Sequence, residues 1–165
     1  MFIYLNGKYL GKNRSCISSK DRGLLLGDGV FETMLYKDKE LILYDLHIKR
    51  LNESLKKIFI NFKLNKKEYK RKIINLIKKN NLINKSSSVR ITVTRGKSVR
   101  GIDVKDNALP TILISTSPLE NNLRLKPVRL GVSDIRRNES SPLSNLKTLN
   151  YLDNIVAKKI SMNQG

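Results

Sequence analysis

The chain has 165 residues, and 39% of them are hydrophobic and spread along its length, which is the apolar content of a globular protein rather than of a disordered chain. Its single cysteine and single histidine, Cys16 and His47, exclude a disulfide scaffold and a zinc module, and no stretch is long enough for a signal core or a membrane helix, which predicts a cytoplasmic protein. With 33 basic and 14 acidic residues the formal net charge is +19, which raises nucleic-acid binding as a first hypothesis.

Two β-hairpins are predicted at the start of the chain. Asn6-Gly7 separates short strands at residues 2–5 and 8–10, and this pair readily takes the positive φ angles of a tight turn. Residues 29–36 alternate as a strand does, and a Lys-Asp-Lys turn leads from them into a second strand at residues 41–44.

Two helices are predicted next. Asp45 can cap the first helix. Its apolar stripe consists of Ile48, Leu51, Leu55, Ile58 and Phe59. A second stripe consists of His47, Arg50 and Ser54. The second helix is expected at about residues 66–81. Its apolar face consists of Tyr69, Ile73, Leu76 and Ile77.

Strands return at residues 89–94 and 111–115, so the order is strands, two helices and strands. This order predicts an α+β fold in which helices pack on one side of a mainly antiparallel sheet. A linker is expected at residues 117–122, then a strand at 128–135 and a helix at about 150–162. One strand and one helix cannot bury each other's apolar faces.

The domain organisation that follows is a small two-layer domain at residues 1–118 and the beginning of a second, incomplete domain at residues 119–165. We expect the apolar sides of this second part to lack partners within the 165 residues.

The positive charge is concentrated in residues 56–85, which hold ten Lys and Arg71 against the single acid Glu68 and so carry +10. Lys, Asn and Ile, whose codons are A/T-rich, number 22, 17 and 17, so genome composition is a competing cause of the charge. No aromatic residues are interleaved in the pattern of a base-stacking platform. A solvated basic helix pair is therefore favoured, and a non-enzymatic nucleic-acid-binding module stays open as an alternative.

Gly27-Asp28-Gly29 begins like a dinucleotide-binding motif, but Glu32 stands at the third glycine position and a strand follows instead of a helix. That interpretation is rejected. The sequence contains no Walker phosphate loop and no clear Ser, His and Asp set. Arg50 and Lys147, taken alone, are most simply surface residues.

Taken in order, several segments resemble those of the class IV aminotransferases, the fold-type IV enzymes that use pyridoxal 5'-phosphate (PLP). The matching segments are Asp21-Arg22-Gly23, Gly27-Asp28-Gly29-Val30-Phe31-Glu32-Thr33, His47-Ile48-Lys49-Arg50-Leu51, Thr94-Arg95-Gly96 with Arg100-Gly101, and Leu146-Lys147-Thr148-Leu149-Asn150-Tyr151-Leu152. Five blocks with agreeing order and spacing make the resemblance much more specific than any one block.

The resemblance implies a role for each matching residue. Lys147 would be the catalytic lysine that links covalently to PLP and then moves the proton at the substrate Cα. Arg50 would bind the cofactor phosphate, and Tyr151 would contact the cofactor's ring hydroxyl. Phe31 and Thr33 would line the substrate side.

Arg100, by the same resemblance, would bind a substrate carboxylate. The Val99-Arg100-Gly101 loop and Thr33 look more like 4-amino-4-deoxychorismate lyase, which releases pyruvate and forms 4-aminobenzoate for folate synthesis. D-amino acid aminotransferases have a histidine where this chain has Ile102, which makes them, with other class IV transaminases, the alternative. Branched-chain aminotransferases usually read Gly-Val-Phe-Glu-Gly and fit less well.

The family's members are longer than this chain, and their later part supplies the acidic partner of the pyridine nitrogen. We therefore expect the chain to correspond to the N-terminal portion of a homodimeric enzyme that acts on an amino acid or on aminodeoxychorismate, with no metal and no membrane partner.

Overall fold

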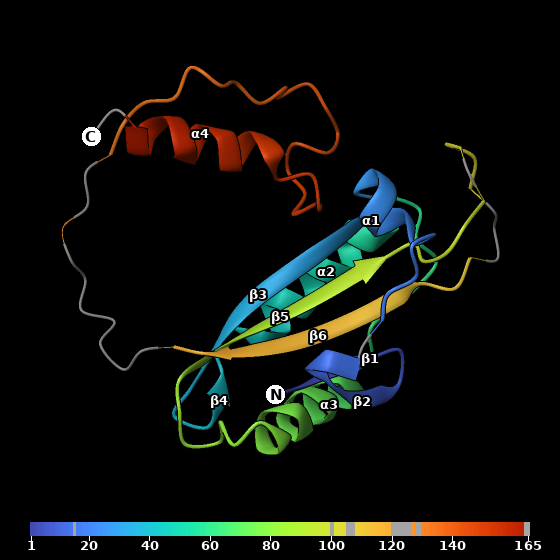
Figure 1. Cartoon of the computed structure of the whole chain (residues 1–165), viewed down its shortest axis with the longest axis vertical. Helices are drawn as coiled ribbons and strands as arrows, with labels where there is room; N and C mark the ends of the chain where they lie inside the picture. The colour runs from blue at the N-terminus through green and yellow to red at the C-terminus, as the bar shows by residue number, and fades with distance from the viewer. Residues whose placement is uncertain (15, 100, 105–107, 120–126, 128–129, 164–165) are drawn as a thin grey trace.

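The computed structural model describes residues 1–14, 16–99, 101–104, 108–119, 127 and 130–163. Its strands are β1 (Phe2–Leu5), β2 (Lys8–Gly11), β3 (Gly29–Lys37), β4 (Glu40–Leu41), β5 (Ser87–Thr94) and β6 (Thr111–Pro118). Its helices are η1 (Lys12–Arg14), α1 (Arg22–Leu26), α2 (Tyr44–Lys57), α3 (Lys66–Lys79) and α4 (Leu152–Asn163). The strands form one sheet in the order β2-β1-β6-β5-β3-β4, and all neighbouring pairs are antiparallel (Figure 1). The predicted α+β class is confirmed.

The first hairpin is confirmed. Leu5 pairs with Lys8, and the two turn residues between them, Asn6 and Gly7, have φ angles of 45° and 95°. The second hairpin is shorter than predicted. Strand β4 ends at Leu41, and Tyr44, expected in that strand, begins α2 instead. The prediction of a strand at residues 41–44 was therefore wrong.

The start and end of α2 also differ from the prediction. Its N-cap is Leu43, with φ of 52° and no side-chain capping bond, while Asp45 lies in the first turn and pairs with Lys66 at 3.0 Å. The helix ends at Lys57. Phe59, predicted on the apolar stripe, has φ of 56° and is 87% exposed, because the chain leaves the helix before it.

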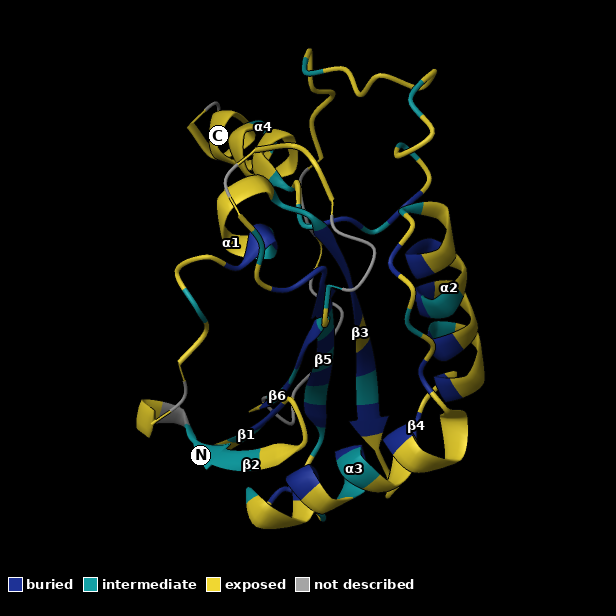
Figure 2. Ribbon diagram, turned by 90° about the vertical axis from the view of Figure 1, so that its right-hand side faces the viewer, coloured by how far each residue is buried: buried dark blue, intermediate teal, exposed yellow. Residues whose placement is uncertain are grey.

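Helix α3 matches its prediction and closes the core. Asn65 caps it by accepting a hydrogen bond from the Glu68 amide at 3.0 Å. The four residues of the predicted apolar face are all buried: Tyr69, Ile73, Leu76 and Ile77. Helix α2 packs on β3, and α3 packs on β1 and β6, so both helices cover the face of the sheet that carries the core (Figure 2).

The C-terminal part departs most from the prediction. Ser117 and Pro118, predicted in a linker, still pair with β5, so β6 extends further than expected. The predicted strand at 128–135 is not formed over its described residues 130–135. The predicted last helix is present as α4, and its residues Leu152, Ile155 and Val156 are 70%, 61% and 40% exposed. The domain boundary at residue 118 stays a prediction.

Helix α1 was missed because five residues are too few for a visible periodicity. Asp21 caps it by accepting from the Gly23 amide at 2.8 Å, and Gly27, with φ of 66°, ends it. Over the described residues, the helices are too short or too polar to cross a membrane.

Gly29, the first residue of β3, tests how tightly the sheet is built at this point. A Cβ added there would lie 2.6 Å from the Val93 carbonyl oxygen and 2.9 Å from the Thr94 Cα. We expect Gly29→Ala to lower the free energy of unfolding, measured by urea titration, by about 2 kcal/mol, because the paired backbones must move apart.

Gly11→Ala is the matched control, since a Cβ at Gly11 would meet no atom within 4 Å. This substitution should leave the midpoint of urea unfolding almost unchanged. Equal effects of the two substitutions would contradict the close approach at Gly29.

Candidate active site

The two faces of β3 separate the core from the candidate site. Val30, Glu32 and Met34 point toward the helices and are buried, while Phe31 and Thr33 point to the opposite face. Phe31 is itself only 5% exposed, and Thr33 is exposed. Alternation along one strand thus places an aromatic ring and a hydroxyl side by side on the outer face of the sheet.

The segment after residue 145 is joined to the start of β3 by backbone hydrogen bonds. The Phe31 amide donates to the Lys147 carbonyl at 3.0 Å, and the Leu149 amide donates to the Gly29 carbonyl at 3.0 Å. Between them, Val30 and Thr148 form an isolated antiparallel bridge. Residues more than a hundred positions apart in the sequence are therefore held beside one another.

This junction brings together three of the predicted site residues. The Lys147 Nζ lies 3.1 Å from the Tyr151 hydroxyl and 4.4 Å from the centre of the Phe31 ring. The rings of Phe31 and Tyr151 meet edge to face with centroids 5.1 Å apart. The amine is thus held between a phenol and an aromatic face.

Arg90 is a fourth member of the cluster that sequence reasoning missed. It pairs with Thr33 across β3 and β5, and its guanidinium carbon lies 3.6 Å from the centre of the Phe31 ring. Its Nε donates to the Thr92 hydroxyl at 3.2 Å, and burial lowers its pKa. The alternation of residues 87–94 could have placed Arg90 on this face, but no matched family segment contained it.

Arg50 is held by a buried carboxylate. Its Nε and Nη2 donate to the two oxygens of Glu32 at 2.5 and 2.7 Å, and His47 Nδ1 lies 2.7 Å from the second of those oxygens. The Glu32 side chain is 1% exposed and that of Arg50 is 57% exposed. Among the described residues, Arg50 Nη1 has no hydrogen-bond acceptor, so this part of the fork points to solvent.

The surroundings of Glu32 favour its ionised carboxylate. Burial would raise the pKa of Glu32, but hydrogen bonds and charge from Arg50 and His47 hold it below the usual range. The hydrogen bond to Glu32 raises the pKa of Arg50, and the nearby Tyr151 raises it further.

Arg100, to which the resemblance assigns a substrate carboxylate, lies outside the described residues. The residues just after it are described, and their carbonyls accept hydrogen bonds from Arg22. The structure thus brings Phe31, Lys147 and Tyr151 together, with Thr33 on the same face of β3. It holds Arg50 through Glu32, whose side chain points to the opposite face of that strand.

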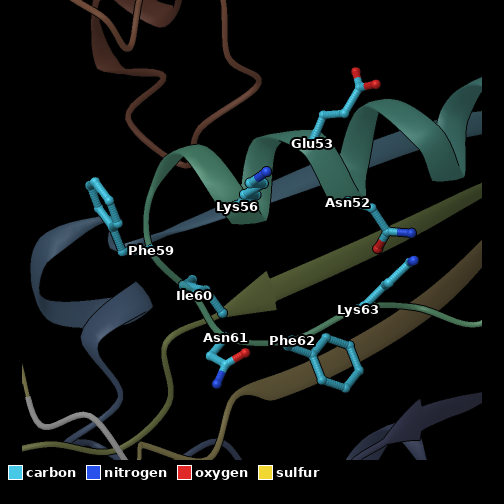
Figure 3. A pocket seen from close by; sticks show the side chains of 8 residues that line it. All are labelled: Asn52, Glu53, Lys56, Phe59, Ile60, Asn61, Phe62 and Lys63. Atoms are coloured by element: carbon cyan, nitrogen blue, oxygen red, sulfur yellow. The ribbon is translucent and has the colours of Figure 1, made fainter.

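Two hollows lie nearby. A cavity of about 1040 Å³ is bordered by α1, the end of α2 and residues 142–150, and Thr148 and Asn150, which flank the Lys147 segment, line it. A second, of about 740 Å³, lies between α2 and the 59–63 loop. Figure 3 shows the rings of Phe59 and Phe62 at this second hollow pointing away from each other, and no predicted site residue lines it.

The basic segment at residues 56–85 forms a solvated face. All of its lysines are exposed except Lys72, which lies 4.4 Å from the Tyr69 ring centre and 5.1 Å from that of Tyr4. The Lys79 Nζ lies 5.6 Å from the ring centres of Phe2 in β1 and Tyr9 in β2. The aromatic rings near these lysines already have cations from this chain as partners.

Residues 29–165 match the model of the family described as amino-transferase class IV. The chain belongs to the class IV aminotransferase family. This confirms the family expected from the five matching segments.

Three curated relatives show the range of activities in that family. The chain is 35% identical over 159 residues to a Methanocaldococcus jannaschii protein provisionally named a branched-chain-amino-acid aminotransferase, covering 96% of the chain and 54% of the relative. It is 32% identical to the aminodeoxychorismate lyase of Bacillus subtilis, covering 95% and 54%, and 28% identical to a D-alanine aminotransferase of Bacillus licheniformis, covering 96% and 55%. The chain therefore spans about half the length of these relatives.

Solved structures share the fold. The 4-amino-4-deoxychorismate lyase of Pseudomonas aeruginosa superimposes with a TM-score of 0.76 at 27% identity, over 95% of this chain and 56% of that one. The branched-chain aminotransferase of Thermoproteus uzoniensis, with norvaline, gives 0.87 at 22% identity, over 100% and 57%. A hypothetical aminotransferase of Mycobacterium tuberculosis in its PLP-bound form gives 0.76 at 19% identity, over 100% and 59%.

We expect the contribution of the buried Glu32 carboxylate to stability to depend on pH. We expect Glu32→Gln to lower the free energy of unfolding at neutral pH by about 1–2 kcal/mol, because it removes the charged acceptor of Arg50 and His47 while Arg50 stays half-solvated. The folded-state pKa of Glu32 lies below its ordinary value of 4.5. Its stabilisation is therefore fully present above 4.5 and is lost as the pH falls through the folded pKa, so the two urea midpoints should converge at acid pH.

Glu53→Gln, on the helix that carries Arg50 and His47, is the control, because Glu53 is 59% exposed and its ion-pair partner Lys49, 3.9 Å away, is also exposed. Its unfolding midpoint should follow that of the wild type at every pH. A difference for Glu32→Gln that stays constant down to the most acid pH would contradict an ionised Glu32 in the folded protein.

Proposed function

We propose that this chain binds PLP through Lys147. The observation that carries the proposal is the amine beside the Phe31 ring, 3.1 Å from the Tyr151 hydroxyl, in a chain of the class IV aminotransferase family. Among the described residues Lys147 forms no ion pair, so its amine is available for an aldehyde. An amine, a phenol and a guanidinium are the donor set that suits the aldehyde, ring hydroxyl and phosphate of this cofactor.

When bound, PLP supplies an electron sink for the electrons released at the substrate carbon. The Lys147 amine moves the proton at that carbon. Tyr151 holds the amine through its hydroxyl, and the Phe31 ring fixes it from another side. Because Phe31 belongs to β3 and the Lys147 segment is joined to that strand by backbone hydrogen bonds, the amine is positioned before substrate arrives.

Arg50 is proposed to hold the cofactor phosphate. Glu32 occupies its Nε and Nη2 and orients the guanidinium plane, which leaves Nη1 directed to solvent. A guanidinium fixed in this way loses little further freedom when it binds an anion.

Two arginines are proposed to meet substrate carboxylates. Arg100 is assigned by the family resemblance, and Arg90 by its half-buried position over Phe31 beside Thr33. Aminodeoxychorismate is a dicarboxylate, so two cations on the substrate side fit its charge. Dicarboxylate substrates of transaminases, such as 2-oxoglutarate, would also need two cations on the substrate side.

The activity we propose is aminodeoxychorismate lyase, which releases pyruvate and leaves 4-aminobenzoate. Its support is the 32% identity to the Bacillus subtilis lyase and the absence of histidine at Ile102. Lys147 would remove the proton from the ring carbon that bears the amine, and the neighbouring ring carbon would then lose its bond to the enolpyruvyl oxygen. Aromatisation of the ring drives this elimination, and the enol that is released takes up a proton to become pyruvate.

A class IV transaminase is the second candidate. The 35% identity to the Methanocaldococcus jannaschii protein favours a branched-chain substrate, although Thr33 departs from the Gly-Val-Phe-Glu-Gly pattern. The D-alanine aminotransferase at 28% identity represents the other transaminase.

A homodimer is part of the proposal. The three leucines of α1, Leu24, Leu25 and Leu26, are 69%, 60% and 51% exposed. They form an apolar surface that a second copy could cover.

The lyase and the transaminases differ in whether they need an amino acceptor. With PLP and aminodeoxychorismate alone, the protein should release pyruvate and 4-aminobenzoate in equal amounts. Lys147→Ala should lower this rate by at least about a thousandfold, since it removes the group that moves the proton. Coupled assays for pyruvate and fluorescence of the aromatic product would measure both.

Lys159→Ala, on the exposed surface of α4, is the control and should retain the wild-type rate. Rapid amino transfer to 2-oxoglutarate from leucine or from D-alanine, with no aromatic product, would instead establish a transaminase. Equal rates for Lys147→Ala and the wild type would reject Lys147 as the catalytic residue.

A further inference from the structure

Asp28, just before β3, lies between two buried guanidinium groups. Arg22 Nε and Arg95 Nε each donate to its Oδ2 at 2.7 Å, and Arg95 Nη2 donates to its Oδ1 at 3.1 Å. The exposed fractions of the two arginine side chains are 5% and 10%, and that of Asp28 is 15%. A single carboxylate thus pairs with two cations in a nearly dry environment.

The other donors of the two arginines reach different backbone segments. Arg22 Nη1 donates to the carbonyls of Gly101 and Asp103 at 2.9 and 3.3 Å, and its Nη2 donates to that of Ile102 at 3.1 Å. One guanidinium therefore binds three consecutive carbonyls.

Arg95 binds the turn that ends α2. Its Nη2 donates to the Ile58 carbonyl at 2.7 Å, and its Nη1 donates to the Phe59 carbonyl at 2.8 Å. Asp28 therefore connects, through two separate cations, a loop that follows β5 and a turn that follows α2.

Each of these two segments carries one large apolar side chain that is exposed. The side chains of Ile102 and Phe59 are each 87% exposed, and Phe59 has a positive φ of 56°. Backbone hydrogen bonds tie residues 58–60 to α2 and Ser98 to Lys20, and the charge-assisted hydrogen bonds from Arg22 and Arg95 add to them. Ile102, Ile58 and Phe59 also line the cavity of about 1040 Å³.

Asp28 is suited to hold both cations. Burial would raise its pKa, but hydrogen bonds from Arg95 and Arg22 hold it below the usual range, so the carboxylate is charged at neutral pH. Arg22 is also fixed through its backbone, because its amide donates to the Gly96 carbonyl at 2.9 Å.

We propose that Arg22 is a positioning residue for the loop that carries the substrate-binding arginine, and that Asp28 orients two guanidiniums that hold this loop and the turn at residues 58–59 separately. The three carbonyls bound by Arg22 belong to the residues that directly follow Arg100. The importance of this positioning for catalysis rests on the proposed function, whereas the test of the positioning needs neither cofactor nor substrate.

Trypsin cleavage of the folded protein can measure each segment separately. Lys97 lies in the loop between β5 and β6 that also contains the carbonyls bound by Arg22, and Lys57 ends the helix whose following turn is bound by Arg95. In Arg22→Met, we expect the Lys97–Ser98 bond to be cut about tenfold faster and the Lys57–Ile58 bond at the wild-type rate, because only the loop loses its donors. Arg95→Met, the matched control on the same carboxylate, should show the reverse.

Arg22→Lys separates positioning from charge. It keeps a cation near Asp28 but replaces the planar fork with one ammonium, which cannot bind the carboxylate and three carbonyls together. We expect cleavage at Lys97–Ser98 to stay several-fold faster than in the wild type, while the reference bond Lys85–Ser86 is cut at the wild-type rate.

Two results would overturn the proposal: resistance of Arg22→Lys equal to that of the wild type, or equal acceleration at all three bonds in both Arg22 variants. A failure of the lyase assay would leave this result standing. A failure here would leave the roles of Lys147 and the lyase proposal untouched.

Discussion

Strand β3 separates the hydrophobic core from the candidate site, and the rest of the structure depends on the alternation of its side chains between these two faces. Its inner residues, Val30 and Met34, pack under α2 together with the charged Glu32, while Phe31 and Thr33 face the site. A buried carboxylate in that position is stable only because Arg50 and His47 of α2 lie within hydrogen-bonding distance of it. The helix is therefore fixed to the strand by the same contact that orients the residue proposed to bind phosphate.

The beginning of β3 imposes a second constraint, because three parts of the chain converge there. Gly29 lets the backbone of β5 approach closely and also accepts a hydrogen bond from Leu149. Asp28, one residue earlier, gathers the two arginines that hold the surrounding loops. The Lys147 segment and the loop after Arg100 are thus both positioned from two adjacent residues, Gly29 and Asp28.

Periodicity was sufficient where one force dominates. The apolar face of α3 and the Asn6-Gly7 turn were predicted correctly, since burial and backbone preference act there alone. The start of α2 was not, because Leu43 takes a positive φ that its residue type does not indicate. Phe59 was misplaced for a similar reason: helical spacing continued in the sequence after the helix had ended.

The candidate site was foreseeable in part. Family segments pointed to Phe31, Arg50, Lys147 and Tyr151, but periodicity could not show that residues 147–149 pair with β3. Arg90 was missed because only its position opposite Thr33 in the sheet reveals it. The Arg22 and Arg95 contacts were likewise invisible, since they run to backbone carbonyls, which no side-chain pattern encodes.

The central claim is that the junction of β3 with residues 147–151 is built to present one amine to PLP. The most direct measurement is reduction of the PLP-treated protein with borohydride, followed by peptide mapping of the attached pyridoxyl group. The account predicts one modified lysine, Lys147, with Phe31→Ala greatly reducing the yield because the ring that positions the amine is lost. Label spread over the exposed lysines of residues 56–85, with Lys147 unmodified, would contradict it.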